Sequence, residues 1–318
     1  MTRKSITQSN GDTVRTTLTY KPPFDWKSHL AFLRYRSIKG VEIVTGNRYA
    51  RSISLDGLDG DFLVEFSEDN YNIEILINFP DSTQLYRIID RIKSIFDLSA
   101  DSKQIDNFLG KDEVLKPMVK KFPGSRVPGC WDGFEVAVRA VLGQQVTVKA
   151  ASTLVSRLAE HHGRQYVSTM DELIYIFPDA GKIQKAKMDG LGIVTQRIAA
   201  IQGIADQVAK GVMIINSTVD TREFVEQICE IKGIGEWTAY YIAMRSLNDP
   251  NAFPYSDLIL RRAVNAGEEL TAKRLLKHSE VWQPWRAYSA ILLWKHYGAI
   301  LNQKAKKITR KRKNIEVI

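Results

Sequence analysis

Alternation of apolar and polar residues predicts a sheet domain in the first third of the chain. Residues 26–36 place Trp26, Leu30 and Leu33 at helical spacing, and residues 85–96 repeat this pattern with four isoleucines. Between these two helices, Asp-Gly turns separate short alternating segments, at residues 42–45, 49–55, 62–67 and 71–78. We therefore expect an α+β N-terminal domain, an antiparallel sheet with helices, over residues 20–97.

From residue 98 onward the apolar spacing is helical throughout, which predicts an all-α domain over residues 98–303. Residues 1–19 are polar, rich in Thr and Ser and without periodicity, so we expect a flexible leader. Residues 304–318 form a basic tail. Helices are expected at residues 134–142, 147–161, 173–177, 180–188, 195–209, 222–230, 238–246, 258–265, 270–278 and 285–297.

The composition indicates an intracellular protein of about two domains. The chain has 318 residues, 44% of them hydrophobic, which is enough for sizeable cores. Charged residues interrupt every apolar run, so no membrane span is predicted. Because the N-terminus lacks the apolar segment of a signal peptide, we expect a cytoplasmic location. Cys130 and Cys229 are too few for a disulfide framework and are expected to be reduced thiols.

The net charge of +9 is typical of a protein that binds a polyanion, but its distribution is uneven. Seven Lys and Arg residues lie between positions 304 and 313, so the rest of the chain is only slightly basic. This tail could attract DNA in a salt-sensitive, sequence-independent way. The alternative is a disordered, solvated chain end.

A short hairpin at residues 231–237 stands between two predicted helices. Gly233 and Gly235 allow a tight turn and a close approach to a ligand, because neither carries a Cβ atom. The helix that follows would direct unpaired N–H groups and the positive end of its dipole towards the hairpin, which suits a phosphate. The alternative is an ordinary turn between two helices.

A loop rich in Pro, Asn and Asp then leads to Asp257, which opens the next predicted helix. Asp257 is either a helix cap or a carboxylate that carries chemistry. The order of hairpin, Pro-containing loop and Asp resembles the helix-hairpin-helix glycosylase superfamily of DNA base-excision repair, in which this Asp is catalytic. Residues 20–26 and 49–52 resemble the N-terminal domain of the AlkA-type family. The resemblance covers almost the whole chain except both tails.

The resemblance implies roles for Asp257 and for three aromatic residues. In AlkA-type enzymes, the positions of Trp237, Tyr241 and Trp294 line the pocket for a base flipped out of the duplex. Aromatic faces attract a cationic, alkylated base, so a broad range of such bases is expected. Asp257 would stabilise the positive charge that develops on the sugar and would orient the attacking water. From spacing alone, the three rings could instead form a packed core.

A break between two predicted helices carries Gln144 and Gln145. Glycosylases that resemble this chain insert a wedge from this turn into the gap left by the flipped base. Gln145 takes the wedge position, at which AlkA-type proteins can carry Leu, so this sequence departs from the pattern. The alternative is a plain surface loop.

The resemblance also bears on cofactors and on strand cutting. Trp237 occupies the position of the Lys nucleophile in relatives that also cut the strand, so a hydrolase without lyase activity is expected. No four-cysteine motif follows Asp257, so no iron–sulfur cluster of that kind is expected, and no cofactor is required. Hairpins of this type can hold Na⁺ or K⁺ through backbone carbonyls, here those of Cys229, Ile231 and Ile234. The DNA backbone would contact the hairpin at Lys232, Gly233, Ile234 and Gly235.

Taken together, the sequence predicts a monomeric DNA glycosylase that acts on duplex DNA containing alkylated bases such as 3-methyladenine and leaves an abasic site. A glycosylase for another lesion, such as uracil or an oxidised purine, is one alternative. A noncatalytic module that binds damaged DNA is the second, although binding alone needs no carboxylate facing DNA. An unrelated helical interaction protein with a basic tail is the third.

Overall fold

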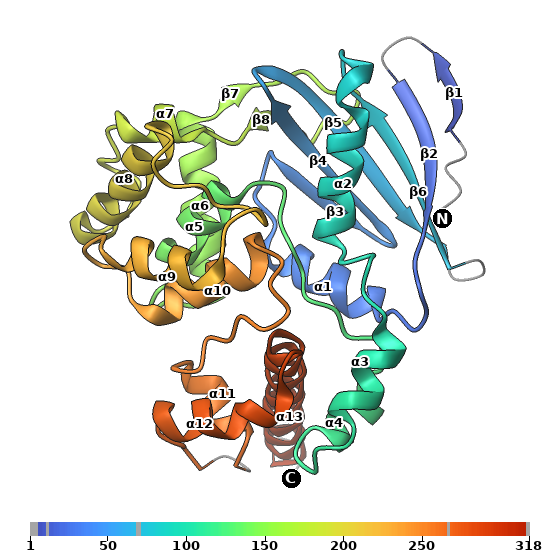
Figure 1. The fold of residues 1–318 in the computed structure, drawn as a ribbon, viewed down its shortest axis with the longest axis vertical. Helices are drawn as coiled ribbons and strands as arrows, with labels where there is room; N and C mark the ends of the chain where they lie inside the picture. Colours follow the sequence, from blue (N-terminus) through green and yellow to red (C-terminus); the bar gives the residue numbers. More distant parts are fainter. Residues whose placement is uncertain (1–5, 11–12, 68–70, 266–267, 316–318) are drawn as a thin grey trace.

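The computed structural model describes residues 6–10, 13–67, 71–265 and 268–315. Its N-terminal part is a six-stranded antiparallel sheet, in the order β1-β2-β6-β5-β4-β3. Helix α2 lies across one face of this sheet, and α1 lies beside β3 (Figure 1). The strands are β1 Ile6–Asn10, β2 Thr13–Thr19, β3 Glu42–Thr45, β4 Arg48–Leu55, β5 Leu58–Phe66 and β6 Asn72–Asn78. The helices of this part are α1 Trp26–Arg36, the 3-10 turn η1 Ser82–Gln84 and α2 Leu85–Ile95.

The prediction of a flexible leader is wrong for the residues that the structure describes. Strand β2 pairs with β6 over its full length, and β1 pairs with β2. Val14, Thr16 and Leu18 alternate along β2 and are buried. The Thr-rich composition looks polar, but β-branched Thr is favoured in strands, and this alternation has period two. The leader prediction for residues 1–5 and 11–12 lies outside the described residues.

The remaining chain is helical and forms two groups, as Figure 1 shows. Helices α5 to α10 form one group, and α3, α4 and α11 to α13 form the other, below it in that view. The helices of the second group are α3 Ser102–Leu109, α4 Lys116–Lys121, α11 Leu258–Ala263, α12 Ala272–His278, the 3-10 turn η2 Ser279–Trp282 and α13 Arg286–Ile315. Those of the first group are α5 Gly133–Leu142, α6 Val148–His162, α7 Ala180–Gln184, α8 Thr195–Ala209, α9 Thr221–Cys229 and α10 Glu236–Ser246.

Two predictions for this part need correction. The segment 173–177 is not helical, because Tyr175–Ile176 is the short strand β8, which pairs with β7 at Arg164–Gln165. Five residues are too few to separate helical from strand periodicity. The last helix does not end at residue 297 as predicted, because α13 continues through residue 315, so the described part of the basic tail is helical. Residues 316–318 of the predicted tail lie outside the described residues.

A buried ionic network joins the sheet to the helical part. Arg51 Nη2 on β4 lies 2.7 Å from Glu135 Oε2 on α5. Arg139 Nη1, one turn further along α5, lies 3.0 Å from Glu135 Oε1 and 3.1 Å from Glu42 Oε2 on β3. Two cations thus balance two carboxylates, which is the condition for burying such charges. The network fixes α5 against the sheet, which matters because Arg139 also lines the cavity described below.

Asp97, which follows α2, carries a buried carboxyl group. The Tyr288 hydroxyl donates a hydrogen bond of 2.7 Å to Asp97 Oδ2. Burial raises the pKa of Asp97 to about 6, although the Tyr288 hydrogen bond and the Arg126 charge act in the opposite direction. Because the pKa is higher in the folded state than in the unfolded state, the neutral Asp97 carboxyl stabilises the fold. This contribution to the free energy of unfolding is complete below the unfolded-state pKa and is lost as the pH rises through about 6.

We therefore expect Asp97→Asn to gain stability over the wild type as the pH rises from 4 to 7, by at most about 3 kcal/mol. Asn tolerates the left-handed backbone at this position, where φ is +50°, and its amide oxygen can still accept from Tyr288. Urea unfolding at several pH values measures the difference. Asp90→Asn on α2 is the control for loss of an exposed carboxylate. A constant difference between variant and wild type across this pH range would contradict the assignment.

Among the described residues, we find no helix that combines the length and the apolar character needed to cross a bilayer.

Candidate active site

A cavity of about 520 Å³ lies where the two helical groups meet. Four residues predicted from the sequence, Trp237, Tyr241, Asp257 and Trp294, all line this cavity. They come from α10, the start of α11 and α13, so residues far apart in the sequence converge here. The opposite wall is formed by residues of α1, α5 and α6: Phe32, Arg36, Arg139, Ala140, Val148, Ala151, Ser152 and Val155.

Asp257 is the only carboxylate among the residues that line this cavity. Its Oδ1 caps α11 by accepting from Leu260 N at 2.9 Å, and it also accepts from Trp294 Nε1 at 3.1 Å. Its Oδ2 accepts from Trp237 Nε1 at 2.8 Å. Asp257 is therefore a helix cap, and the same carboxylate also lines the cavity. Two indole donors and one backbone donor fix its direction.

The aromatic residues form one wall of the cavity. The rings of Trp237 and Tyr241 are stacked, with centroids 5.6 Å apart and planes 13° from parallel. Trp294 meets Tyr241 edge to face at 6.3 Å. All three side chains are only partly buried, so they bound an open space and are not a closed core. The neighbouring Tyr240 packs against Tyr255 instead.

The cavity wall also contains two cationic side chains, Arg36 and Arg245, that the sequence does not predict as site residues. Arg36 stacks on the Phe32 ring at 3.8 Å, and Arg245 Nη1 donates to the Tyr241 hydroxyl at 3.3 Å. Burial acts to raise the pKa of Tyr241, but the charges of Arg245 and Arg36 outweigh burial and lower it. No sequence signal marks Phe32 and Arg36, because α1 belongs to the sheet domain and reaches the cavity only through its packing on α6. The sheet domain thus supplies Phe32 and Arg36 to the cavity wall.

The two glycines of the hairpin between α9 and α10 have different roles in the structure. Gly233 adopts φ of +95°, which favours glycine. Gly235 has φ of −108°, which any residue can adopt, but a Cβ atom there would meet nothing within 4 Å. No side chain caps α10 at Gly235, so its first N–H groups remain available to an anion. Lys232 is exposed on the same turn.

The two glutamines at the α5–α6 turn have different surroundings. Gln144 Nε2 donates to the Gly233 carbonyl and to Thr238 Oγ1, each at 3.0 Å, so it ties this turn to the hairpin. Gln145 is exposed and adopts the left-handed region with φ of +53°. A side chain anchored by two hydrogen bonds cannot enter DNA without breaking them. Gln145 is therefore the better candidate for the wedge.

Replacement of Gln145 by Gly removes the side chain and also relieves the backbone strain at this position. We expect unchanged or slightly increased thermal stability, with base excision from duplex DNA reduced about tenfold, since a lost wedge leaves the flipped state less favoured. Excision from single-stranded DNA, where no stack is broken, serves as the internal comparison. Gln145→Leu, which retains the volume, should keep most of the activity. An equal loss on both kinds of DNA would contradict the wedge assignment.

Of the carbonyls expected to hold a monovalent ion, that of Cys229 ends α9, and those of Ile231 and Ile234 lie on the hairpin. The Ile231 carbonyl accepts from Ile234 N at 3.0 Å and retains a second lone pair. Carbonyl oxygens are suitable ligands for Na⁺ or K⁺, so this carbonyl is free to contribute to such a site. In the part of the chain that the structure describes, no three His, Cys, Asp or Glu side chains are grouped so that they could hold a metal ion.

The fold and this site together define a class of protein. A sheet domain precedes a helical domain in which a Gly-containing hairpin, an acidic helix cap and an aromatic cavity converge, as in the helix-hairpin-helix glycosylases. The family model described as the AlkA N-terminal domain matches residues 15–132. The chain is thus similar to the AlkA-type family, and its residues 15–132 match the N-terminal domain of that family.

Three relatives illustrate the likeness. The chain is 33% identical over 301 residues to a probable bifunctional transcriptional activator/DNA repair enzyme AlkA of Mycobacterium tuberculosis, with 94% of this chain aligned; it spans only 60% of that relative's length. It is 27% identical to DNA-3-methyladenine glycosylase 2 of Escherichia coli, covering 87% of this chain and 96% of the relative. The solved 3-methyladenine DNA-glycosylase of Archaeoglobus fulgidus shares the fold, with a TM-score of 0.76, 22% identity and coverage of 88% and 97%.

Proposed function

We propose that this protein is a monofunctional DNA glycosylase, which hydrolyses the N-glycosidic bond of alkylated bases such as 3-methyladenine and leaves an abasic site. The carrying observation is the position of Asp257, a carboxylate fixed by two tryptophans at the wall of a cavity lined by stacked aromatic rings. The names of the relatives, a DNA repair enzyme and a DNA-3-methyladenine glycosylase, support the same activity.

The mechanism follows from the arrangement of charge and aromatic surface. A base taken out of the duplex would stack on the Trp237–Tyr241 wall, and a cationic base would gain cation–π attraction there. Cleavage of the glycosidic bond leaves positive charge on the sugar, which the Asp257 carboxylate would stabilise. Asp257 would also orient or deprotonate the attacking water. Because an alkylated base is a good leaving group, no second acid is needed.

The proposed partner is duplex DNA containing such bases. The exposed hairpin, with Lys232 and the uncapped start of α10, would contact the backbone phosphates, and Gln145 would fill the gap in the stack. A Na⁺ or K⁺ ion on the hairpin carbonyls would bridge to a phosphate. No other cofactor is proposed. We further propose that the protein acts as a monomer within the cytoplasm.

A second candidate is a glycosylase of the same kind for another lesion. Arg36 and Arg245 line the cavity in addition to the aromatic rings. The Arg245 guanidinium also donates to the carbonyls of Pro128 and Gly129. Guanidinium groups are hydrogen-bond donors, which suit the carbonyl oxygens of uracil or of an oxidised purine better than a cationic ring. These arginines therefore favour uracil or an oxidised purine as a second substrate class, beside the alkylated bases.

Base release from duplexes that carry 3-methyladenine, uracil or an oxidised purine separates the two candidates. We expect the fastest release for the alkylated base, with the strand left intact until alkali is added. Preferential release of uracil or the oxidised purine would favour the second candidate. Tight binding to an abasic-site analogue without release of any base would indicate a noncatalytic damage-binding module.

A further inference from the structure

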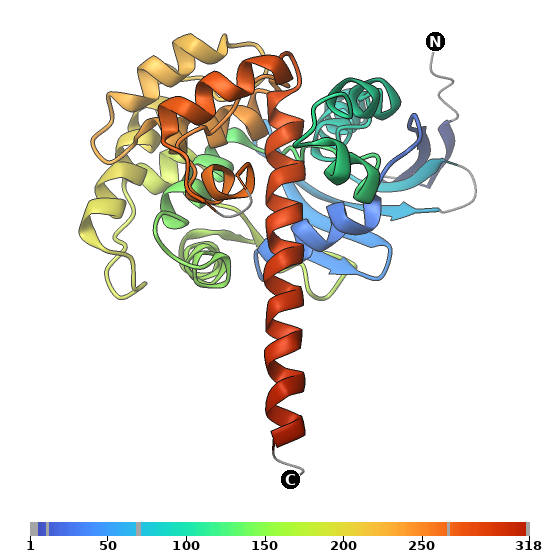
Figure 2. The same cartoon turned by 90° about the horizontal axis from the view of Figure 1, so that it is seen from below.

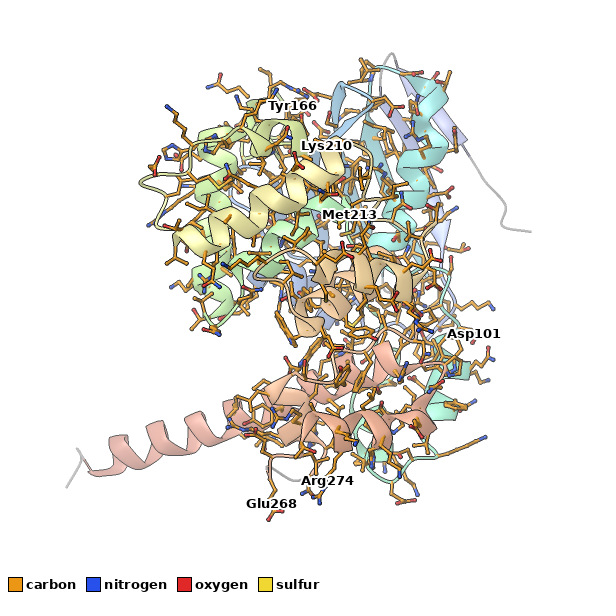
Figure 3. The ribbon with its side chains drawn as sticks, turned by 60° about the vertical axis from the view of Figure 1, so that its left-hand side comes forward. Asp101, Tyr166, Lys210, Met213, Glu268 and Arg274 are labelled. Atoms are coloured by element: carbon orange, nitrogen blue, oxygen red, sulfur yellow. The ribbon has the colours of Figure 1, made fainter. Side chains whose placement is uncertain are left out.

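Helix α13 continues far beyond the site. Its first third packs in the molecule and supplies Ile291, Trp294 and Lys295 to the cavity. Residues 296–300 are still half-buried, and beyond them the helix leaves the rest of the molecule and continues alone, which Figure 2 shows from below and Figure 3 from the side. The site and the projecting segment are thus parts of one continuous helix, Arg286–Ile315.

The reach of this segment is set by helix geometry. At a rise of about 1.5 Å per residue, residues 304–313 lie about 14 to 27 Å beyond Lys295. Lys295 itself is held in place, since its Nζ lies 2.6 Å from Asp25 Oδ2 and 2.8 Å from Ser125 Oγ. On duplex DNA, with a spacing of about 3.4 Å per base pair, the same distances correspond to about four to eight base pairs.

The charge of the segment calls for an anionic partner. Seven of the ten residues from 304 to 313 are Lys or Arg, and no Asp or Glu occurs between residues 281 and 315. A solvated helix ordinarily gains from Glu–Lys pairs at i, i+4 spacing, whereas like charges at that spacing destabilise it. The negative end of the helix dipole offsets this repulsion only in the last turn. A line of phosphates would neutralise the whole segment.

We propose that residues 304–313 of α13 form a second DNA-binding element, which contacts the phosphate backbone of the duplex on one side of the flipped base only. The inference rests on the proposed function in one respect, because it takes the cavity as the position of the flipped base. The contact is independent of base sequence, and it would hold the enzyme on undamaged duplex while lesions are sought.

Asymmetric duplexes test the proposal. Each carries an abasic-site analogue with four base pairs on one side and fourteen on the other, and a second set has the long arm reversed. We expect the full-length chain to bind one of the two orientations about tenfold more tightly at low salt. A variant with all seven Lys and Arg residues replaced by Gln, a good helix former, should bind both orientations equally. A variant in which the five Lys of positions 304, 306, 307, 311 and 313 become Arg is the control that preserves charge.

Salt dependence and hydrogen exchange give independent readouts. The slope of log affinity against log salt should become shallower by about 3 in the Gln variant, if about three residues neutralise phosphates at about 0.9 each. Amides of residues 304–315 should gain protection from exchange when the long-armed duplex binds the wild type. Equal slopes and no protection would overturn the proposal. So would a loss of self-association in the Gln variant with unchanged DNA affinity, because the segment would then be a contact between copies of this chain.

Failure of the catalytic proposal is distinguishable from failure of this one. If the wild type releases no base but still discriminates the two orientations, the DNA-binding element stands and the enzymatic assignment falls. If base release from saturating, short-armed substrate is the same in wild type and Gln variant while the orientation effect is absent, the enzymatic assignment stands and the second DNA contact falls.

Discussion

Asp257→Asn is expected to reduce base release at least about 10³-fold while leaving the protein folded and able to bind DNA. The substitution removes the negative charge that would stabilise the sugar cation. An Asn oxygen can still cap α11 through Leu260 N, because Asn is as good a cap as Asp, so the stability should change by less than about 1 kcal/mol. Single-turnover release from methylated duplex measures the chemical step apart from binding.

A matched control for Asp257→Asn is Asp220→Asn. Asp220 caps α9 in the same way, by accepting from the amides of Arg222 and Glu223. This variant should release base at the wild-type rate. Activity of Asp257→Asn within a few fold of wild type would show that the carboxylate only caps the helix.

Trp237 should account for the second-largest effect, because it contributes both a ring face and a hydrogen bond. Trp237→Ala removes the stacking surface against Tyr241 and the 2.8 Å bond to Asp257 Oδ2. We expect a loss of about 10- to 100-fold in kcat/KM on an alkylated base, since stacking of one base on an aromatic side chain contributes about 1–3 kcal/mol. Trp237→Phe keeps a ring and loses the hydrogen bond, so it should retain more substrate affinity and lose mainly kcat.

Trp285→Phe serves as the control for Trp237→Phe. Trp285 packs edge to face on Tyr288, with ring centroids 5.6 Å apart, and should affect stability alone. If Trp237→Ala and Trp237→Phe lose the same amount, the hydrogen bond to Asp257 and not the stacking surface is what matters. Wild-type activity in Trp237→Ala would contradict the assignment of this wall to the base.

Strongly periodic segments of this fold could be predicted from the sequence, and less periodic ones could not. Helices at residues 26–36 and 195–209 were predicted with the bounds that the structure has. Strand β2 was missed because its outward positions are Thr and Arg and its alternation is short. The helix predicted at residues 173–177 is wrong, since pairing with Arg164–Gln165 decides that segment and this contact is not local.

The part of the site that could be predicted is encoded in one short segment of the sequence. The hairpin, the loop and Asp257 follow one another in the chain, and the structure places Trp294 beside them. Arg36 could not be predicted, because its approach to Tyr241 depends on how the sheet domain packs against the helices. The different surroundings of Gln144 and Gln145 could not be predicted either. The two residues are adjacent and identical, and only the hydrogen bond of Gln144 to the hairpin distinguishes them.

The most direct test of the account is the identity of the products released from methylated duplex DNA by the wild-type protein. We expect free 3-methyladenine and an abasic site in an uncut strand, with this release lost in Asp257→Asn. Release of no free base under conditions in which the protein binds an abasic-site analogue would contradict the assignment of this cavity to alkylated-base excision. Strand cutting without alkali would contradict the monofunctional mechanism.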